Sequence, residues 1–189
     1  MKEKLIASIQ AQYHLSKEFT AYLYQVSRLE TLKKGRLLQR IGDTSEHIWF
    51  LGQGYVKSRY FDQSGKQHIT RFWKENELIL VKDSFNNKSQ ALDDIVSMEN
   101  VTALSVDYQQ VQQVLTTYPE SNRLSRWVHV TDERSSRLRL NLLTLPTDEA
   151  YALFCEKFKH FPLNRFLQQD IAAYLNCSPH TISMIRRKK

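Results

Sequence analysis

The sequence is poor in the residues that carry metal or disulfide chemistry. Its two cysteines, Cys155 and Cys177, are too few for a disulfide framework, a zinc CxxC pair or the four ligands of an iron–sulfur cluster. So little cysteine is typical of a reducing compartment, and we therefore expect a cytoplasmic protein. The six histidines are scattered, with no HxH or HxxxH pair among them, so the sequence predicts no metal site.

The sequence also lacks long apolar runs and the motifs of most enzymes. Its mean hydropathy is -0.51, and no apolar run approaches the ~20 residues that cross a bilayer. Residues 1–6 mix acids with bases, so we expect no secretory signal. There is no Gly-rich phosphate loop, no nucleophile motif and no convincing pair of catalytic acids beyond Asp93-Asp94. We therefore expect no enzyme; a cupin-like metal enzyme is the alternative, and metal content would test it.

Positive charge is in excess, because 27 Lys and Arg residues stand against 20 Asp and Glu residues, which gives a net charge of +7. A basic chain favours a polyanionic partner. Residues 186–189 are all basic, and the nearest acid before them is Asp170. A tail of this kind is either a solvated end or part of a binding surface. With 41% hydrophobic and 25% charged residues, the composition is otherwise that of a globular protein.

The first part of the chain changes from a helical to a β-rich pattern. Apolar residues recur at helical spacing over 5–29, with a break at Leu15-Ser16. Residues 62–65, Asp-Gln-Ser-Gly, predict a hairpin turn, because Asp opens turns and Gly tolerates a positive φ. The predicted strands, which indicate a small antiparallel sandwich or barrel, are 36–41, 47–51, 55–61, 68–73, 78–81, 95–98 and 102–106.

A long helix is predicted from Pro119 to Leu145, and Pro146 ends it. A heptad-like seam runs along this helix through Leu124, Val128, Thr131, Ser135, Leu138, Leu142 and Leu145. Such a seam favours pairing with the same helix of a second copy. The alternative is a helix that packs on its own domain, since the seam includes two small polar residues. Thr147 is predicted to cap a further helix over 148–160, and residues 161–164 to connect it to the next.

Residues 168–187 have the pattern of a helix-turn-helix, in which two short helices cross closely over a tight turn. Asn176 stands where the turn needs a left-handed residue, and Ser178-Pro179 is typical of a helix cap followed by the first helical residue. A chance pair of core helices is the alternative. The inward positions hold Ile171, Leu175, Cys177, Ile182 and Ile185, and Ala172 stands where the helices touch.

The second helix of this motif presents a face that could enter a major groove. A step of ~100° per residue turns Ile182 inward and places Met184 and Arg187 outward. Arginine suits guanine, and methionine offers apolar contact to a thymine methyl. The predicted DNA contacts are the base-reading residues His180, Ser183, Met184 and Arg187, the docking residues Gln169, Ser178 and Thr181, and the basic residues Arg186, Lys188 and Lys189.

A set of short motifs is spread along nearly the whole chain. They are Lys34-Gly35, His47-Ile48-Trp49-Phe50-Leu51 with Gly54, the turn at 62–65, Tyr118-Pro119, Asp132-Glu133-Arg134 with Leu138, and Ile171-Ala172-Ala173-Tyr174-Leu175 with Thr181-Ile182-Ser183. Together they resemble the Crp/Fnr superfamily, the cyclic AMP receptor protein family of bacterial transcription regulators. The chain is most similar to the compact branch whose members stop just after the recognition helix.

This resemblance implies an α+β chain of three parts. These are a cyclic-nucleotide-binding-like β-roll (jelly roll) sensor at 1–118, a dimerisation helix at 119–145 and a winged-helix-like helix-turn-helix domain at 146–189. The implied function is sequence-specific transcription regulation by a homodimer on double-stranded DNA, with RNA polymerase as a further candidate partner and no membrane partner. The alternative is a ligand-sensing or protein-interaction module that keeps the fold but has lost specific DNA readout.

One departure from the family concerns its effector. Relatives that bind cyclic AMP hold its phosphate with an arginine in an Arg-Ser/Thr-Ala triplet, whereas residues 89–91 here read Ser-Gln-Ala. No arginine occurs between Arg71 and Arg123, so the charge-assisted pair is missing. We therefore expect no cyclic AMP and leave open whether another small effector exists. Lysines that could hold another anion, or are simply solvated, are Lys74, Lys82 and Lys88.

A second departure lies in the recognition helix. Relatives commonly carry Ser-Arg-Ile-Arg where residues 183–186 here read Ser-Met-Ile-Arg. Arginine and methionine make different contacts with base edges. The sequence therefore predicts a half-site different from that of these relatives.

Overall fold

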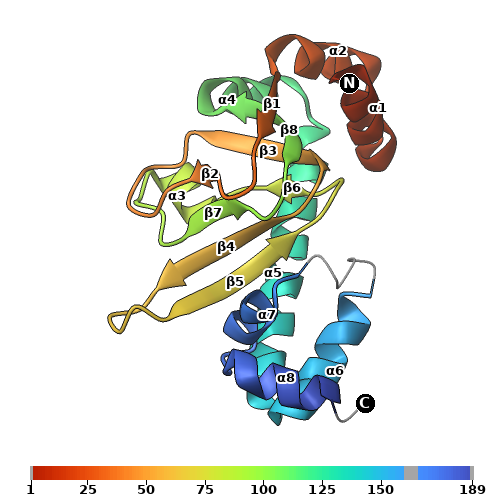
Figure 1. The fold of residues 1–189 in the computed structure, drawn as a ribbon. Helices are drawn as coiled ribbons and strands as arrows, with labels where there is room; N and C mark the ends of the chain where they lie inside the picture. Colours follow the sequence, from red (N-terminus) through yellow and green to blue (C-terminus); the bar gives the residue numbers. More distant parts are fainter. Residues whose placement is uncertain (1, 160–165, 188–189) are drawn as a thin grey trace. The chain divides into compact units, whose positions relative to one another are not determined.

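The computed structural model describes residues 2–159 and 166–187 (Figure 1). The chain forms two compact units. The first consists of Met1–Lys57 with Phe72–Thr131, and the second of Ser58–Arg71 with Asp132–Lys189. A β-hairpin from the middle of the sequence therefore belongs to the same unit as the carboxyl-terminal helices.

The strands form two four-stranded sheets, and each strand pair with an assigned register is antiparallel. The first sheet has the order β1-β8-β3-β6, made by Arg28–Leu32, Val101–Asp107, His47–Gln53 and Leu78–Ile79. The second has the order β2-β7-β4-β5, made by Leu37–Gln39, Asp94–Ser97, Val56–Phe61 and Gln67–Trp73. The helices associated with the first unit are α1 (Lys2–Tyr13), α2 (Lys17–Val26), α3 (Lys82–Asn87) and α4 (Tyr108–Thr117).

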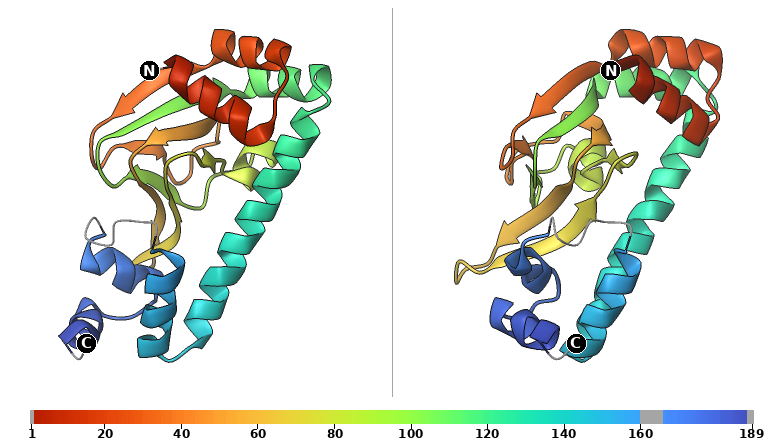
Figure 2. Two further views of the ribbon diagram at one scale, coloured as in Figure 1. Left: turned by 90° about the vertical axis from the view of Figure 1, so that its right-hand side faces the viewer. Right: turned by 45° about the vertical axis from the view of Figure 1, so that its right-hand side comes forward.

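Strand β3 separates two apolar cores, because successive side chains of a strand point to opposite faces. Trp49 and Leu51 belong to an inner core together with residues of β4, β5, β7 and β8. Phe50 between them belongs to a second core, which α1 and α2 cover. Figure 2 shows these two helices beside β3 and β8. Leu5 on α1 packs so closely that any side chain at Gly52 would meet it.

The second unit contains α6 (Thr147–Lys157), α7 (Gln168–Tyr174) and α8 (Pro179–Arg187), and α5 (Ser121–Thr144) spans the boundary between the units. Its core is aromatic. The ring of Phe154 stacks on Phe158 with centroids 4.4 Å apart and lies 5.7 Å from the ring of Tyr174. Ile171 and Ile182 are fully buried, which holds the two short helices together.

Several local predictions are confirmed. Ser16 accepts a hydrogen bond from the Phe19 N–H (3.1 Å) as the cap of α2, so the helical region breaks where the sequence indicated. Asp62 accepts from the N–H groups of Ser64 (2.9 Å) and Lys66 (3.1 Å), which closes the predicted hairpin turn.

Other predictions were wrong. The helical pattern over 5–29 ends at Val26, and Arg28–Leu32 is strand β1. Helix α3 lies between the predicted strands 78–81 and 95–98, and α4 follows the last predicted strand, where no helix was predicted. Thr147 is the first residue of α6 rather than its cap; Pro146 occupies the cap position and makes no side-chain hydrogen bond. Proline restricts its own φ, so it can open a helix without a capping side chain. The connector predicted at 161–164 lies outside the described residues.

Candidate nucleic-acid interface

The scaffold of the predicted helix-turn-helix is present in α7 and α8. Ala172, where the two helices touch, is 1% exposed. Asn176 has φ +52°, so the turn between the helices uses the left-handed conformation that its sequence position predicted. The Cys177 N–H donates to the Ala172 carbonyl at 2.9 Å, which closes the turn. These contacts fix where α8 begins.

The hydroxyl groups at the start of α8 serve the helix itself. Ser178 Oγ accepts from the Thr181 N–H at 3.0 Å, and the two hydroxyl oxygens lie 2.8 Å apart. Ser178 is exposed and Thr181 is half-buried. Because a hydroxyl oxygen has two lone pairs and a donor, this cap leaves hydrogen-bonding capacity toward solvent. Pro179 is the first residue of α8. Its lack of a backbone N–H costs the helix nothing, because the N–H of a first helical residue has no partner within the helix.

The structure brings the predicted base-reading residues to one exposed face of α8. His180, Met184 and Arg187 are exposed, Met184 to 41%, while Ser183 is half-buried. On the opposite side, Ile182 is completely buried. The face therefore carries an imidazole, a thioether, a guanidinium and a hydroxyl, which can read hydrogen-bonding and apolar features of base edges.

Other residues predicted to contact DNA have different surroundings. Arg186 donates through Nε to the Tyr151 hydroxyl at 2.8 Å, so α8 is joined to α6 by this side chain. Gln169 is exposed, whereas its neighbour Gln168 donates to the Pro179 carbonyl and so ties α7 to α8. Lys188, and Lys189 after it, lie outside the described residues.

Sequence reasoning missed the contact between the β4–β5 hairpin and this motif. Lys66 at the hairpin donates through Nζ to Asn176 Oδ1 at 2.8 Å, and Gln67 donates to Asp170 Oδ1 at 3.4 Å. Asp170 is 1% exposed. Lys66 and Asn176 are 110 positions apart, and the turn motif that contains Asn176 says nothing about a distant partner, so no local signal pointed to this contact.

The hairpin is itself held by polar contacts near its turn. Asp62 Oδ2 lies 2.8 Å from His68 Nε2, and the His68 ring stacks on Tyr60 with centroids 4.9 Å apart. The hydrogen bonds from Ser64 and His68 hold the pKa of the Asp62 carboxyl well below its usual range. Farther along the hairpin, Arg139 on α5 donates through Nε to the Ile69 carbonyl at 2.9 Å.

The predicted seam on α5 is only partly available to a second copy. Leu124 packs against the core beneath α1 and α2, and Leu142 is 1% exposed. The remaining seam residues, Val128, Thr131, Ser135, Leu138 and Leu145, are half-buried. These five residues retain exposed surface that a partner helix could cover.

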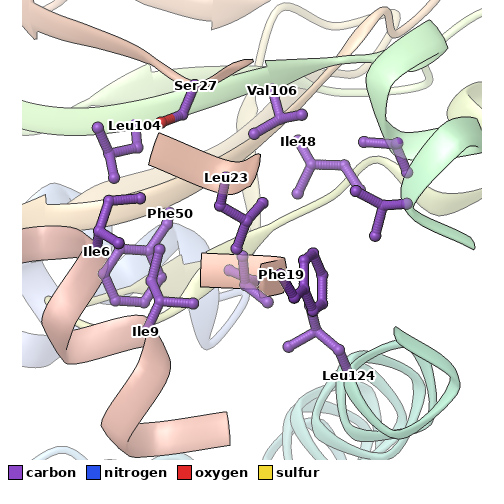
Figure 3. Close-up of a pocket in the computed structure, with 13 residues that line it drawn as sticks. Ile6, Ile9, Phe19, Leu23, Ser27, Ile48, Phe50, Leu104, Val106 and Leu124 are labelled. Carbon is purple, nitrogen blue, oxygen red and sulfur yellow. The ribbon is translucent and has the colours of Figure 1, made fainter. Parts of the chain in front are cut away.

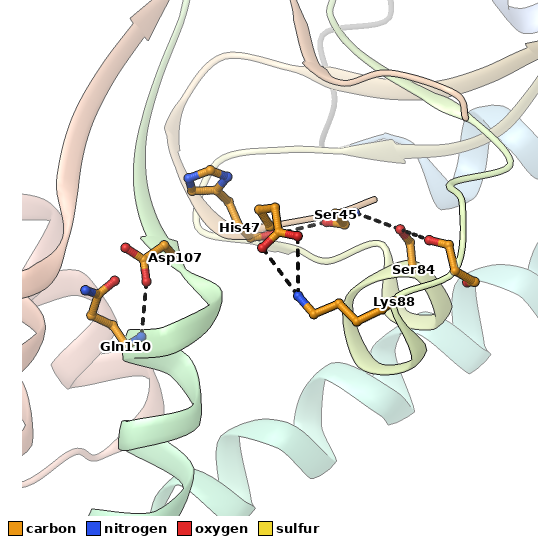
Figure 4. A network of polar contacts seen from close by, with 8 residues as sticks. Ser45, His47, Ser84, Lys88, Asp107 and Gln110 are labelled. Carbon is orange, nitrogen blue, oxygen red and sulfur yellow. Dashed lines mark hydrogen bonds and ion pairs between the residues drawn. The ribbon is translucent and has the colours of Figure 1, made fainter. Parts of the chain in front are cut away.

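The lysines considered as an anion site have partners. Lys88 Nζ lies 3.3 Å from Glu46 Oε2 (Figure 4). It also lies 3.2 Å from the centre of the Tyr108 ring. Beside it, Ser84 Oγ accepts from the Ser45 N–H at 2.7 Å and donates to the Ser89 carbonyl at 2.6 Å. This network surrounds the stretch where relatives carry the phosphate-binding arginine. A lysine neutralised by glutamate is poorly suited to replace that arginine.

In the described ranges, no three His, Cys, Asp or Glu side chains come together as a metal-binding group. The two cysteines are free, and burial raises the pKa of the Cys177 thiol. Within those same ranges, no helix is both long enough and apolar enough to cross a membrane.

Residues 29–118 match the cyclic nucleotide-binding domain family. The chain is 25% identical over 175 residues to the transcriptional activator protein Anr of Pseudomonas protegens, and the match covers 85% of this chain and 69% of Anr. The c-di-GMP-responsive global regulator CLP of Xanthomonas campestris has a similar fold, with a TM-score of 0.76, 13% identity and coverage of 92% of this chain and 91% of CLP. FixK2 of Bradyrhizobium japonicum also has a similar fold, with a TM-score of 0.74 and 12% identity. The match covers 86% of this chain and 84% of FixK2.

Proposed function

We propose that this chain is a transcription regulator of the Crp/Fnr type and that it binds double-stranded DNA sequence-specifically through the exposed face of α8. This proposal rests on the difference in burial between the two sides of that helix. Ile182 is fully buried against the scaffold, while His180, Met184 and Arg187 face solvent. A helix held by its neighbours and bearing free base-reading side chains is the arrangement that major-groove recognition requires.

We assign each residue on and next to α8 a role from its contacts. Arg187, His180, Ser183 and Met184 read bases, whereas Ser178, Thr181 and Gln169 set the docking angle through phosphates. Arg186 has a structural role through Tyr151 and adds positive charge. Lys188 is proposed to add sequence-independent attraction through counterion release.

The active species is proposed to be a homodimer that pairs through α5 and acts in the cytoplasm. The half-buried residues Thr131, Leu138 and Leu145 stand seven apart, the spacing at which a second helix of the same sequence meets them. Such a dimer reads a pseudo-palindromic site with half-sites about one helical turn apart. RNA polymerase is a candidate further partner.

Cyclic AMP is not proposed as the effector. Residues 89–91 offer no arginine to the cyclic phosphate, and Lys88 is paired with Glu46. A buried phosphate without a bidentate partner loses the charge-assisted hydrogen bonds that hold it. The domains are proposed to be those that the resemblance implied, with the β4–β5 hairpin of the sensor reaching the helix-turn-helix through Lys66.

In vitro selection from a random duplex pool, followed by sequencing, tests this function. The wild-type protein and an Arg187→Ala variant are compared at two salt concentrations, and the oligomeric state of each is measured in the same buffer. We expect the wild-type protein to enrich a palindrome and the variant to lose preference at one position of each half-site. A dimeric wild-type protein that binds DNA in a salt-dependent way, yet enriches no sequence, would contradict specific readout.

A further inference from the structure

A small apolar cavity lies within the first unit, between the helices α1 and α2 and the first sheet (Figure 3). Its volume is about 80 Å³. Its walls include Ile6 and Ile9 from α1, Leu23 from α2, and Leu104 and Val106 from β8. With one exception, the side chains that line it are hydrocarbon or aromatic.

The exception is Ser27, whose hydroxyl has no hydrogen-bond partner within the described part of the chain. The residue is only 4% exposed, so water does not satisfy the hydroxyl from the surface. Its backbone is satisfied, since the N–H donates to the Leu23 carbonyl at 3.0 Å and the carbonyl accepts from Lys2 Nζ. A buried hydroxyl left without a partner lowers stability, and an acceptor or donor supplied by a ligand would remove that penalty.

Water alone is a poor occupant of this cavity. A buried water needs two to four polar partners, and the walls offer one hydroxyl. Cavities lined by aliphatic and aromatic side chains stay dry and admit apolar molecules, as a cavity of roughly 150 Å³ admits benzene or xenon. The present cavity has about half that volume. It therefore suits a molecule of about three to five heavy atoms with an apolar body and one polar end.

The cavity is separate from the region where the family binds cyclic nucleotides. On β3, Phe50 lines the cavity, whereas its neighbours Trp49 and Leu51 point into the inner core on the other face of the sheet. The paired Lys88 and its network stand near α3 and take no part in the cavity wall. A ligand here would contact different elements from a bound cyclic nucleotide.

We propose that this cavity is a binding site for a small apolar molecule with one hydrogen-bonding group, such as a short-chain alcohol, whose polar end pairs with the Ser27 hydroxyl. Leu124 of α5 also lines the cavity. If the proposed function holds, a bound molecule contacts the helix through which the dimer forms. The binding itself does not depend on that function, and it is measured without DNA.

Methyl NMR of the full-length protein, labelled at its Ile, Leu and Val methyl groups, tests the site with two probes. Xenon binding tests whether the cavity admits an apolar atom. Binding of 2-propanol tests this too, and it also tests whether the ligand forms a hydrogen bond with the Ser27 hydroxyl. We expect saturable shifts at the lining methyl groups, with a millimolar dissociation constant for 2-propanol, because a ligand of four heavy atoms has little binding energy. Ser27→Ala should weaken the affinity for 2-propanol about three- to tenfold and leave the affinity for xenon unchanged.

A pair of valine variants controls for the location. Val106→Leu adds a methylene group to the cavity wall and should weaken both probes, whereas Val130→Leu on the exposed side of α5 should affect neither. The proposal is overturned if the shifts do not saturate, if they spread over the whole protein, or if Ser27→Ala leaves 2-propanol binding unchanged. If the selection experiment enriches no DNA sequence, this counts against the proposed function. It does not affect the ligand titrations, which are measured without DNA.

Discussion

Replacing Arg187 with alanine tests whether α8 reads bases. Arg187 is exposed in the last turn of the helix and shows no hydrogen bond or ion pair to the rest of the described chain. A bidentate contact to guanine contributes ~1–3 kcal/mol of discrimination, which corresponds to about 5- to 150-fold in the ratio of specific to random affinity. The same substitution removes one phosphate-neutralising charge, so the salt slope should fall by about 0.9 if the residue also lies near the backbone.

The neighbouring arginine provides a matched control, since Arg186→Ala removes the same charge from the same helix. Arg186 donates to the Tyr151 hydroxyl at 2.8 Å, and its guanidinium lies 5.8 Å from the centre of that ring. Loss of one hydrogen bond costs ~0.5–1.5 kcal/mol, which lowers the Tm of a protein of this size by about 1–6 °C. We therefore expect Arg186→Ala to reduce stability and leave the sequence preference intact.

Competition binding by fluorescence anisotropy separates these effects. A labelled duplex bearing the selected site competes with unlabelled selected or random duplex at two salt concentrations, and the Tm of each variant is measured in parallel. Arg187→Ala should reduce the specificity ratio with an unchanged Tm. Equal losses on selected and random DNA for Arg187→Ala, or a lost preference for Arg186→Ala, would show that the roles of the two arginines are wrongly assigned.

Three further predictions concern stability and assembly. Ser27→Ala should raise the Tm by about 2 °C, because it removes a buried hydroxyl without a partner in the described chain. In the same thermal scan Ser97→Ala should lower the Tm by about 4–10 °C, because the Ser97 hydroxyl accepts from the Arg36 N–H and shares its one proton between the carbonyls of Lys33 and Arg36. Asp62 has a lowered pKa in the folded state, so its stabilisation is present at neutral pH and is lost as the pH falls through the carboxyl range; the Tm difference from Asp62→Asn should shrink below about pH 4. Leu138→Asp should dissociate the proposed dimer in sedimentation velocity at micromolar concentration, while Leu140→Asp should not, since Leu140 is 63% exposed and lies about 160° around the helix from Leu138.

The helix-turn-helix could be predicted from the sequence because its requirements are local. The left-handed turn residue Asn176, the cap at Ser178 and the buried positions all fall within one segment of twenty residues. Each follows from the conformational preference of a single residue type or from helical periodicity. Contacts between distant segments do not have such a signature, and the hydrogen bond from Lys66 to Asn176 was therefore missed.

The sequence did not predict the elements β1 and α4, and the reason differs between them. The strand β1, Arg28–Leu32, follows α2 without an intervening Gly or Pro, and its apolar residues continue the helical spacing. Its strand conformation is determined by pairing with β8, whose partner residues are 69 to 77 positions away in the sequence. The helix α4 did carry a usable signal, since Asp107 caps it by accepting from the Gln110 N–H at 3.1 Å, and Asp followed three residues later by Gln is a capping pattern.

The seam on α5 shows why an apolar stripe does not by itself identify its partner. Periodicity places Leu124, Leu138 and Leu142 on one side of the helix, but burial in a single chain distinguishes them. Leu142 is 1% exposed and Leu124 packs in the core under α1 and α2, so both are covered by their own chain. Leu138 keeps exposed surface on a helix whose neighbouring residues are mostly polar. A charge at Leu138 should therefore act mainly through a second copy, whereas one at Leu142 would disrupt the fold in the monomer as well.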